Sequence, residues 1–163
     1  LQNKNMLPLQ TGKKIAFVGF GVNTNNAFSD SIKSHYNADV YWISYKDSTT
    51  KSDSIFRALQ NNYDAIVVSI HGLTKYPSHN FGLSQKAVDL MNKIVAKPNV
   101  VTFLFGNPYA IKNVCNATNL VACYEDDIIF QQQAFKLLKG TVKPNGTLPV
   151  TVCEKYAFGS GIL

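Results

Sequence analysis

The sequence predicts an α/β fold, a three-layer α/β/α sandwich around a six-stranded, mostly parallel sheet that is flavodoxin-like in appearance. Two observations support this prediction. Apolar runs alternate along the chain with segments whose apolar residues recur at helical spacing. Several of the runs are unbroken, which is typical of strands that are buried on both faces. Strands that alternate with helices at this spacing lie in a parallel sheet with helices on both sides.

Six strands are expected from the apolar runs. The first ends at a glycine-containing turn, and the third has the buried-type centre Ala-Ile-Val-Val-Ser-Ile. The fourth follows the Pro-Asn turn at residues 98–99, and the sixth follows the Pro-Asn-Gly turn at residues 144–146. In chain order the predicted strands are residues 13–20, 38–44, 63–71, a run that starts at Val100, 120–124 and 147–152.

Five helices are expected between these strands. Ser52 or Asp53 is a suitable N-cap for the second helix and Ser84 for the third, because their side-chain oxygens can accept from free backbone N–H groups. Pro108 suits the first turn of the fourth, where its missing N–H costs nothing. In chain order the predicted helices are residues 25–36, 52–61, 84–95, a segment that starts at Pro108, and 125–138.

Composition indicates one globular domain over residues 1–163, with residues 1–12 as a leading segment and residues 153–163 as a tail. Apolar residues make up 45% of the chain and charged residues 16%, which excludes a disordered chain. No apolar run approaches the roughly 20 residues that span a bilayer. Because Leu1 is not an initiator methionine, we expect the chain to be cut from a longer protein.

The net charge of +6 indicates a solvated basic surface. Of the 16 basic residues only Arg57 is an arginine, and nucleic-acid recognition depends on the bidentate fork of arginine. Cys115, Cys123 and Cys153 lack the spacing of metal ligands, so no metal site and no cofactor is predicted. Cys123 lies in an apolar strand and is expected to be a buried free thiol. An odd number of cysteines leaves the compartment open, with a periplasmic or secreted location as our expectation.

Ligands of such sheets bind outside the carboxyl ends of the strands. The segment Gly19-Phe-Gly21 is at this position, but Thr24 stands where a dinucleotide fingerprint needs its third glycine. The connection over residues 71–82 is the longest and chemically the most mixed, so a functional loop is expected there. The loops of interest are residues 19–26, 45–51, 71–82, 106–109 and 124–127.

Candidate catalytic groups in these loops are sparse. His71 and His79 lie in the long loop, but no carboxylate occurs between Asp64 and Asp89 to serve as a partner. The three carboxylates at 125–127 are interpreted as a cap cluster, which suits the positive end of a helix dipole. The motif of serine hydrolases is missing from every strand-to-helix turn. No catalytic residue is therefore predicted in this chain.

Several segments, in this order, resemble the C-terminal domain of glycoside hydrolase family 3. Residues 5–9, Asn-Met-Leu-Pro-Leu, resemble the segment that follows the linker in that family, and residues 14–19 resemble its first strand. Residues 103–109 resemble its "L-F-G-x-P-Y" strand and loop, and residues 122–125 its "A-Y-E" step. The last matches are residues 140–150, similar to "L-x-G … G-x-L-P-V", and residues 156–161, similar to "Y-x-x-G-x-G".

The resemblance implies that this chain is one domain of a glycosidase that cleaves terminal, non-reducing β-linked sugars. Its partner would be an N-terminal (β/α)8-type barrel that carries the nucleophilic Asp, with the carbohydrate substrate at the domain interface. Some family members take a Glu acid/base from this domain, but only Glu125 and Glu154 are present. That scarcity indicates the β-N-acetylhexosaminidase-like branch, in which the barrel supplies a His–Asp pair. In that case Lys75, His79 and Asn80 are the candidate substrate contacts.

Two other functions fit the same fold class. A stand-alone flavodoxin-like module for a nucleotide or another ligand would need a phosphate cradle after the first strand. A purely structural or interaction domain would expose an apolar patch on one side, where a partner domain is missing.

Overall fold

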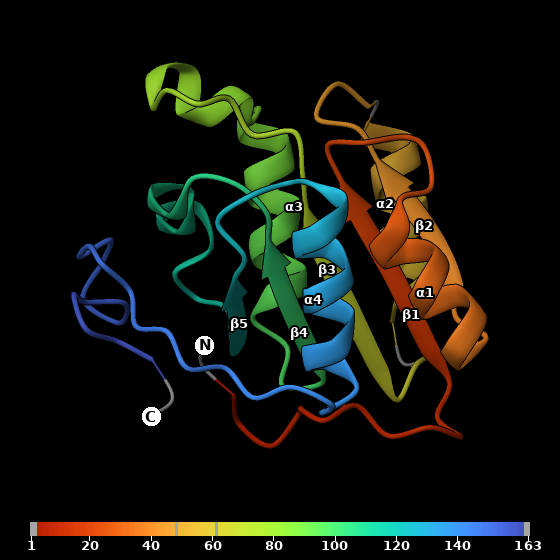
Figure 1. Cartoon of the computed structure of the whole chain (residues 1–163). Coiled ribbons are helices and arrows are strands. Elements are labelled where there is room, and N and C mark those ends of the chain that lie inside the picture. The colour runs from red at the N-terminus through yellow and green to blue at the C-terminus, as the bar shows by residue number, and fades with distance from the viewer. Residues whose placement is uncertain (1–2, 48, 61, 162–163) are drawn as a thin grey trace.

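The computed structural model describes residues 3–47, 49–60 and 62–161, and a parallel sheet forms its centre (Figure 1). The five strands of this sheet are ordered β2-β1-β3-β4-β5, and every neighbouring pair is parallel. The first strand, β1, lies inside the sheet. The chain adds β2 on one side of it and then adds β3, β4 and β5 in turn on the other side. The strands are β1 (Ile15–Phe20), β2 (Asp39–Ile43), β3 (Ala65–Ile70), β4 (Val100–Leu104) and β5 (Asn119–Ala122).

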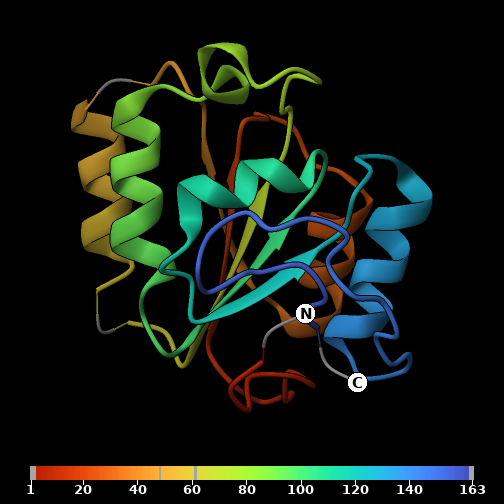
Figure 2. The ribbon, with the colours of Figure 1, turned by 90° about the vertical axis from the view of Figure 1, so that its left-hand side faces the viewer.

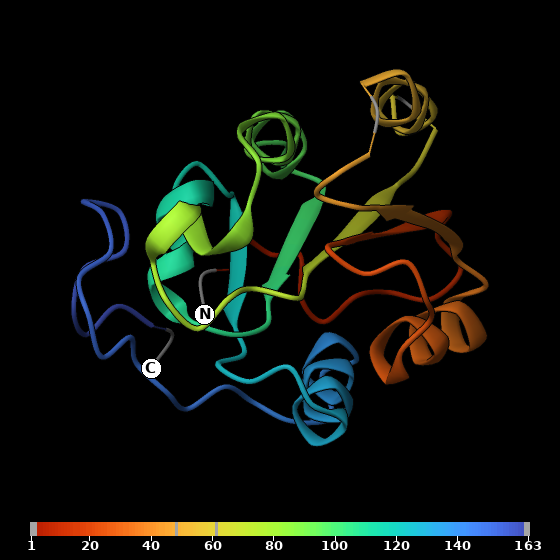
Figure 3. The ribbon, with the colours of Figure 1, turned by 90° about the horizontal axis from the view of Figure 1, so that it is seen from above.

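Helices cover both faces of the sheet, which confirms the α/β/α sandwich (Figure 3). On one face lie α1 (Ala27–Tyr36) and α4 (Ile128–Leu138), and on the other lie α2 (Thr49–Ala58), α3 (Gln85–Val95) and the 3-10 helix η2 (Pro108–Val114). Each face has its own apolar core. All residues of β1, β3 and β4 are buried because they lie between these two layers.

The predicted sixth strand is wrong. In the described part of the chain, residues 147–152 join no strand of the sheet. They pair instead with the tail that follows them: Leu148 N–H donates to the carbonyl of Ser160 at 2.7 Å, and Gly159 N–H donates to that of Leu148 at 2.8 Å. Pro149 has no backbone N–H to donate to a ladder, so this segment packs beside the sheet as a loop.

Most helices begin within a few residues of their predicted start. Ser84 is the N-cap of α3, as predicted, and Pro108 opens η2. The second helix begins at Thr49, ahead of both residues that were predicted to cap it, so neither Ser52 nor Asp53 is its N-cap. The predicted end of that helix at residue 61, and residues 1–2 and 162–163 of the two end segments, lie outside the described residues.

A disulfide joins the tail to the body of the domain. Cys115, just after η2, is bonded to Cys153, and Cys123 is free and buried as predicted. The Tyr156 hydroxyl, on the same tail, donates to the carbonyl of Ala117 at 2.9 Å. The tail therefore covers the outer side of β5 and η2, which Figure 2 shows in front of the sheet.

Candidate functional site

The loops that follow the strands all open on one edge of the sheet. Because β2, β1 and β3 are neighbours, residues after these three strands meet there, at the point where the strand order reverses. Doubly wound sheets bind ligands at this place. The short 3-10 helix η1 (Ser78–Gly82) belongs to the long loop after β3 and lies at this edge (Figure 1).

A histidine–aspartate pair lies at the base of these loops. His71 follows β3 directly and is fully buried, and its Nδ1 is 2.8 Å from Asp126 Oδ1. Its ring stacks on Phe105 with the two planes 8° apart. The other Asp126 oxygen accepts from the Gly72 N–H at 3.2 Å. The pair thus joins the loop after β3 to the loop after β5.

The second ring nitrogen of His71 faces an amide. Its Nε2 is 3.3 Å from Asn26 Nδ2, and the Asn26 oxygen is already engaged because it accepts from the Ser29 N–H at 2.9 Å. Asn26 therefore offers its NH₂ group, so Nε2 accepts and Nδ1 donates to Asp126. Both ring nitrogens therefore have partners inside the domain, and the buried His71 ring holds these loops relative to one another.

Asp126 is held as a carboxylate by its neighbours. Burial by itself would raise its pKa, but hydrogen bonds from His71, Gln131 and the Gly72 N–H lower it below the ordinary 3.8. Gln131 Nε2 donates to Asp126 at 2.9 Å, while its Oε1 accepts from the Ala27 N–H at 3.1 Å. One network therefore ties the beginnings of α1 and α4 to the loop after β3.

The cap cluster predicted at residues 125–127 is only partly correct. Asp127 is the N-cap of α4 and accepts from the N–H groups of Ile129 and Phe130, each at 2.9 Å. Asp126 belongs to the His71 pair, and the exposed Glu125 caps nothing. The missing partner for a loop histidine thus comes from a loop 55 residues away in sequence.

A tight contact holds the loops after β1, β2 and β3 together. The Tyr45 hydroxyl donates to the His71 carbonyl at 2.5 Å, and burial raises the tyrosine's pKa. Gly21 sits between them with a φ of 90°, and a Cβ at this position would lie 2.3 Å from the His71 carbonyl oxygen. Only glycine fits there, so the Gly19-Phe-Gly21 turn serves close backbone packing.

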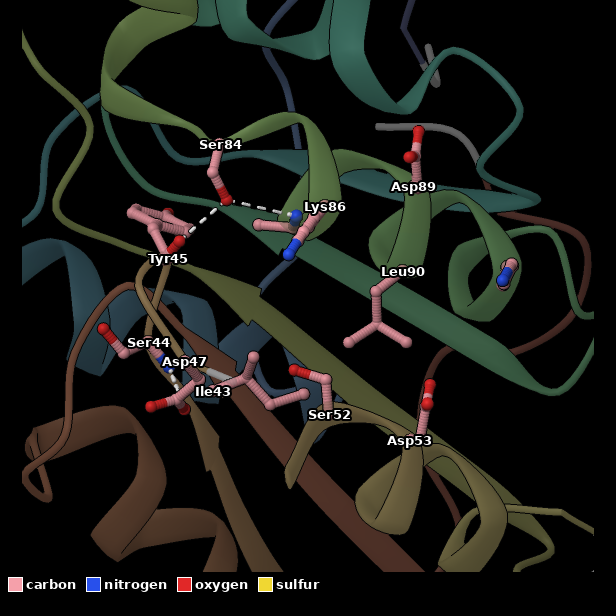
Figure 4. A pocket seen from close by; sticks show the side chains of 12 residues that line it. Ile43, Ser44, Tyr45, Asp47, Ser52, Asp53, Ser84, Lys86, Asp89 and Leu90 are labelled. Atoms are coloured by element: carbon pink, nitrogen blue, oxygen red, sulfur yellow. Dashed lines mark hydrogen bonds between the residues drawn. The ribbon is translucent and has the colours of Figure 1, made fainter. Parts of the chain in front are cut away.

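Next to this contact is a shallow cleft of about 500 Å³, lined by residues from the loops after β1, β2 and β3. Its polar groups include Ser44, Lys46 and the exposed His79. A smaller hollow of about 170 Å³ continues from it between α2 and α3 (Figure 4). There the Ser84 hydroxyl donates to the Tyr45 carbonyl at 2.7 Å, so this wall is fixed. The hollow presents Asp53, Asp89 and lysine side chains, a mixture of both charge signs.

The three predicted substrate contacts are not all at this cleft. His79 lines it, whereas Lys75 and Asn80 do not. The carbonyl of Lys75 accepts from Asn107 Nδ2 at 3.2 Å, which places Lys75 toward the loop after β4. His79, Asn80 and Phe81 all have a left-handed backbone, with φ of 49–60°, and Phe81 is fully buried. The buried Phe81 ring therefore anchors a loop whose neighbouring side chains face solvent.

The described residues contain no group of three or more His, Cys, Asp and Glu side chains that could hold a metal ion. None of the helices in the same residues is long and apolar enough to cross a membrane. The site is thus an edge of loops that an internal polar network holds in place, beside an open cleft.

These features define a doubly wound α/β domain in which a pair between the buried His71 and the partly exposed Asp126 holds the loops at the carboxyl edge of the sheet. The family model "Glycosyl hydrolase family 3 C-terminal domain" matches residues 1–157. The chain therefore belongs to this family. No curated protein matches the sequence.

Three solved structures have similar folds. A family 3 β-N-acetylglucosaminidase from Paenibacillus sp. is 18% identical, with a TM-score of 0.72 over 93% of this chain and 30% of its own. A fungal multi-domain β-N-acetylglucosaminidase is 20% identical, with a TM-score of 0.66 over 94% of this chain and 17% of its own. A β-glucoside phosphorylase, BglX, is 17% identical, with a TM-score of 0.61 over 93% of this chain and 28% of its own. The chain spans less than a third of the length of each.

Proposed function

We propose that this chain is the non-catalytic C-terminal domain of a family 3 β-glycosidase of the β-N-acetylhexosaminidase type. The full-length protein would hydrolyse terminal, non-reducing β-linked sugars, with its nucleophilic Asp in an N-terminal (β/α)8-type barrel. In this arrangement the domain forms a wall beside the active-site mouth, with Lys75, His79 and Asn80 as candidate contacts to the carbohydrate.

This proposal rests on the observation that two carboxylates at the loop edge are engaged in contacts inside the domain. A glycosidase needs two carboxyl-type groups that flank the scissile bond. In the loop after β5, Asp126 is engaged by His71, Gly72 and Gln131, and Asp127 caps α4. All three carboxylates of that loop are exposed, and Glu125 is the one whose side chain makes no hydrogen bond to the described residues. This use of the loop carboxylates supports a reactive pair that comes from another part of the full-length protein.

Two observations favour the hexosaminidase branch. The resemblance implies that members of this branch take their acid/base from the barrel, and the loop over residues 71–82 contains no carboxylate. Two of the proteins with similar folds are β-N-acetylglucosaminidases. A β-glucosidase-type protein would instead need Glu125 or Glu154 as its acid/base.

An assay of the full-length protein tests the proposal directly. Aryl β-N-acetylglucosaminide and aryl β-glucoside are supplied with and without inorganic phosphate, because one similar structure is a phosphorylase. We expect hydrolysis of the N-acetylglucosaminide by the full-length protein and none by residues 1–163 alone. Turnover by the isolated chain would contradict the proposal.

Glu125→Gln in the full-length protein separates the two branches. We expect kcat/KM to stay within about twofold of the wild-type value, because removing a group that takes no part in proton transfer costs little. A general acid contributes about 10²–10⁴-fold, so a loss of that size, with a changed pH profile, would assign the acid/base to this domain.

The rival function, a flavodoxin-like nucleotide module, is opposed by the start of α1. A phosphate site there would use the free N–H groups of the first helical turn. Two first-turn donors are used inside the domain: the Ala27 N–H donates to Gln131 and the Ser29 N–H to the Asn26 side chain. A phosphate would have to displace these two hydrogen bonds.

The disulfide supports a periplasmic or secreted location for the protein. Disulfides such as Cys115–Cys153 persist in oxidising compartments and are rare in the cytosol. Fractionation of the source cells, followed by mass spectrometry of the 115–153 pair without reduction, tests this location. Recovery of both residues as free thiols from the cytosolic fraction would contradict it.

A further inference from the structure

Charge is distributed unequally between the two edges of the sheet. The helices run back against the strands, so each helix ends at the edge where the strands begin, which we call the amino edge (Figure 1). The second halves of the helices, the segments between them and the next strands, and the segments that contact the start of β5 together form this edge. They carry eleven of the 16 lysines and arginines but only three of the ten carboxylates, Asp39, Asp64 and Glu154. The amino edge therefore has a formal net charge of +8, whereas the rest of the domain has −2.

The positive charge is densest where α1 and α4 end side by side (Figure 3). The ring of His35 lies 5.7 Å from that of Phe135, and Lys139 Nζ lies 5.4 Å from the centre of the same ring. The leading segment passes beneath both helix ends, where the Leu9 N–H donates to the Leu138 carbonyl at 2.8 Å. We use the name basic corner for six exposed residues at this place: Lys13, Lys33, His35, Lys136, Lys139 and Lys143.

The domain does not neutralise these cations. Within the described part of the chain, the side chains of the basic corner form no ion pair. Two carboxylates of the amino edge already have other partners: Asp39 accepts from the Tyr63 hydroxyl at 2.7 Å, and Asp64 accepts from the Lys14 N–H at 2.8 Å. The third, Glu154, lies on the tail. The charge of the basic corner is therefore available to a partner in solution.

The helix dipole accounts for only part of this charge. Cations near a helix C-terminus are stabilising, which suits Lys33 and Lys136 in the last turns and Lys139 at the C-cap of α4. Six of the eleven cations of the amino edge lie outside the helices, among them Lys13 and Lys143. Their presence adds positive charge that the helices do not need, and like charges that gather on one face repel one another unless a counter-charge is near.

We infer that the basic corner binds an anionic polysaccharide, one whose sugars carry carboxylate or phosphate groups, and thereby holds the protein on it. The choice of a glycan rests on the proposed function, in which the full-length protein acts on sugars. The corner contains no arginine and no exposed aromatic ring, the two features on which binding of nucleic acids depends. None of the exposed large apolar side chains belongs to it either, and a membrane-surface site needs such side chains to enter the lipid.

Retention of the full-length protein on beads tests the inference. The probe is alginate, a polyuronate, and uncharged agarose beads are the control. We expect retention on alginate alone, and we expect its loss as salt rises from 0.1 M to 1 M, because the screening length falls from about 10 Å to about 3 Å. Passage through alginate at low salt would overturn the inference. Phosphatidylglycerol vesicles that bind the protein more tightly than soluble alginate does would also overturn it, in favour of a membrane.

Two matched triple variants separate the basic corner from net charge in general. One removes three corner cations by Lys13→Gln, Lys33→Gln and Lys136→Gln. The other removes three cations from the opposite half of the domain, and its changes are Lys46→Gln, Lys86→Gln and Lys112→Gln.

We expect the first triple variant to bind soluble alginate about tenfold more weakly than the wild type, because a local concentration of charge sets the attraction. The second should stay within about twofold of the wild type. Equal weakening in the two variants would show that alginate senses only the net charge, and the inference would fail.

The aryl glycoside assay described above keeps the two proposals distinguishable, because its substrates are small and uncharged. If the full-length protein hydrolyses the aryl N-acetylglucosaminide but is not retained on alginate, only the inference about the basic corner is wrong. If it is retained on alginate and hydrolyses neither aryl glycoside, the proposed function fails.

Discussion

At the scale of single residues, the pair His71–Asp126 decides how the loop edge is organised. The histidine is buried beside Phe105, and both of its nitrogens have partners. A buried polar network of this kind stabilises a fold only when each member is satisfied. Its role here is to fix three loops relative to one another.

We expect Asp126→Asn to destabilise the isolated domain at neutral pH by about 1–3 kcal/mol, the range for a hydrogen bond to a charged group. Because the pKa of Asp126 is lowered in the folded state, its contribution is fully present above its ordinary value of 3.8 and is lost as pH falls through the lowered value. The difference in free energy of unfolding between the wild-type domain and the Asp126→Asn variant should therefore shrink below about pH 4.

Urea unfolding from pH 3 to 7 measures this difference. Asp53→Asn is the matched control, since Asp53 is exposed and is expected to change stability by less than about 0.5 kcal/mol at any pH. A difference that stays constant over the whole pH range would show that the carboxylate charge is unimportant.

At the scale of secondary-structure elements, only one of the three carboxylates at residues 125–127, that of Asp127, caps the start of α4. Asp127 accepts from two backbone N–H groups of the first turn, whereas Glu125 accepts from none of them. Helix starts leave N–H groups without partners, and a short side chain directly before the helix reaches them best.

Asp127→Ala should therefore lower the free energy of unfolding by about 1 kcal/mol, the typical value of an N-cap. The neighbouring Glu125→Ala should change it by less than about 0.5 kcal/mol. Chemical denaturation of both variants at pH 7 measures these values. Equal losses would restore the interpretation of residues 125–127 as a shared cap.

At the scale of the whole molecule, the tail is held by a covalent bond and by pairing with itself. Cys115–Cys153 closes a segment of the chain with a sequence separation of 38. Residues 147–152 form no strand of the sheet. The tail is fastened by this bond, by hydrogen bonds from Lys155 and Tyr156 to the Ala117 carbonyl, and by the burial of Leu148 and Tyr156 in the core.

Replacing both Cys115 and Cys153 with Ser should destabilise the domain by about 2–4 kcal/mol, the usual effect of a native disulfide. Thermal unfolding with and without a reductant measures it. The wild-type domain should lose stability in reductant, whereas the double variant should not respond. If the Tm of the wild-type domain were the same with and without reductant, the bond would have no stabilising role.

The domain as a whole should not bind nucleotides or flavins. The N–H groups of Ala27 and Ser29 at the start of α1 are used internally, so we expect millimolar ATP or FMN to leave Tm unchanged. A ligand present at about 1,000 times its Kd would raise the free energy of unfolding by about 4 kcal/mol. Differential scanning fluorimetry of residues 1–163 makes the comparison. A saturable rise in Tm with FMN would favour the flavodoxin-like alternative.

Local patterns in the sequence predicted most of the fold. Unbroken apolar runs identify β1, β3 and β4 because both faces of these strands are covered. Ser84 and Pro108 mark helix starts because capping depends on residues within one turn. The prediction of a sixth strand at residues 147–152 was wrong because an apolar run after a turn does not show whether a neighbouring strand is free to pair with it.

The sequence by itself determined the succession of strands and helices along the chain and the two helical layers, since these depend on neighbours within a few residues. It also determined the family, since this depends on the order of short motifs. Only the tertiary structure decided which groups meet at the loop edge. His71 and Asp126 are 55 residues apart, and Cys115 and Cys153 are separated by 38. Such pairs form because the order of strands in the sheet, which no local pattern encodes, brings their loops to the same edge or the same side.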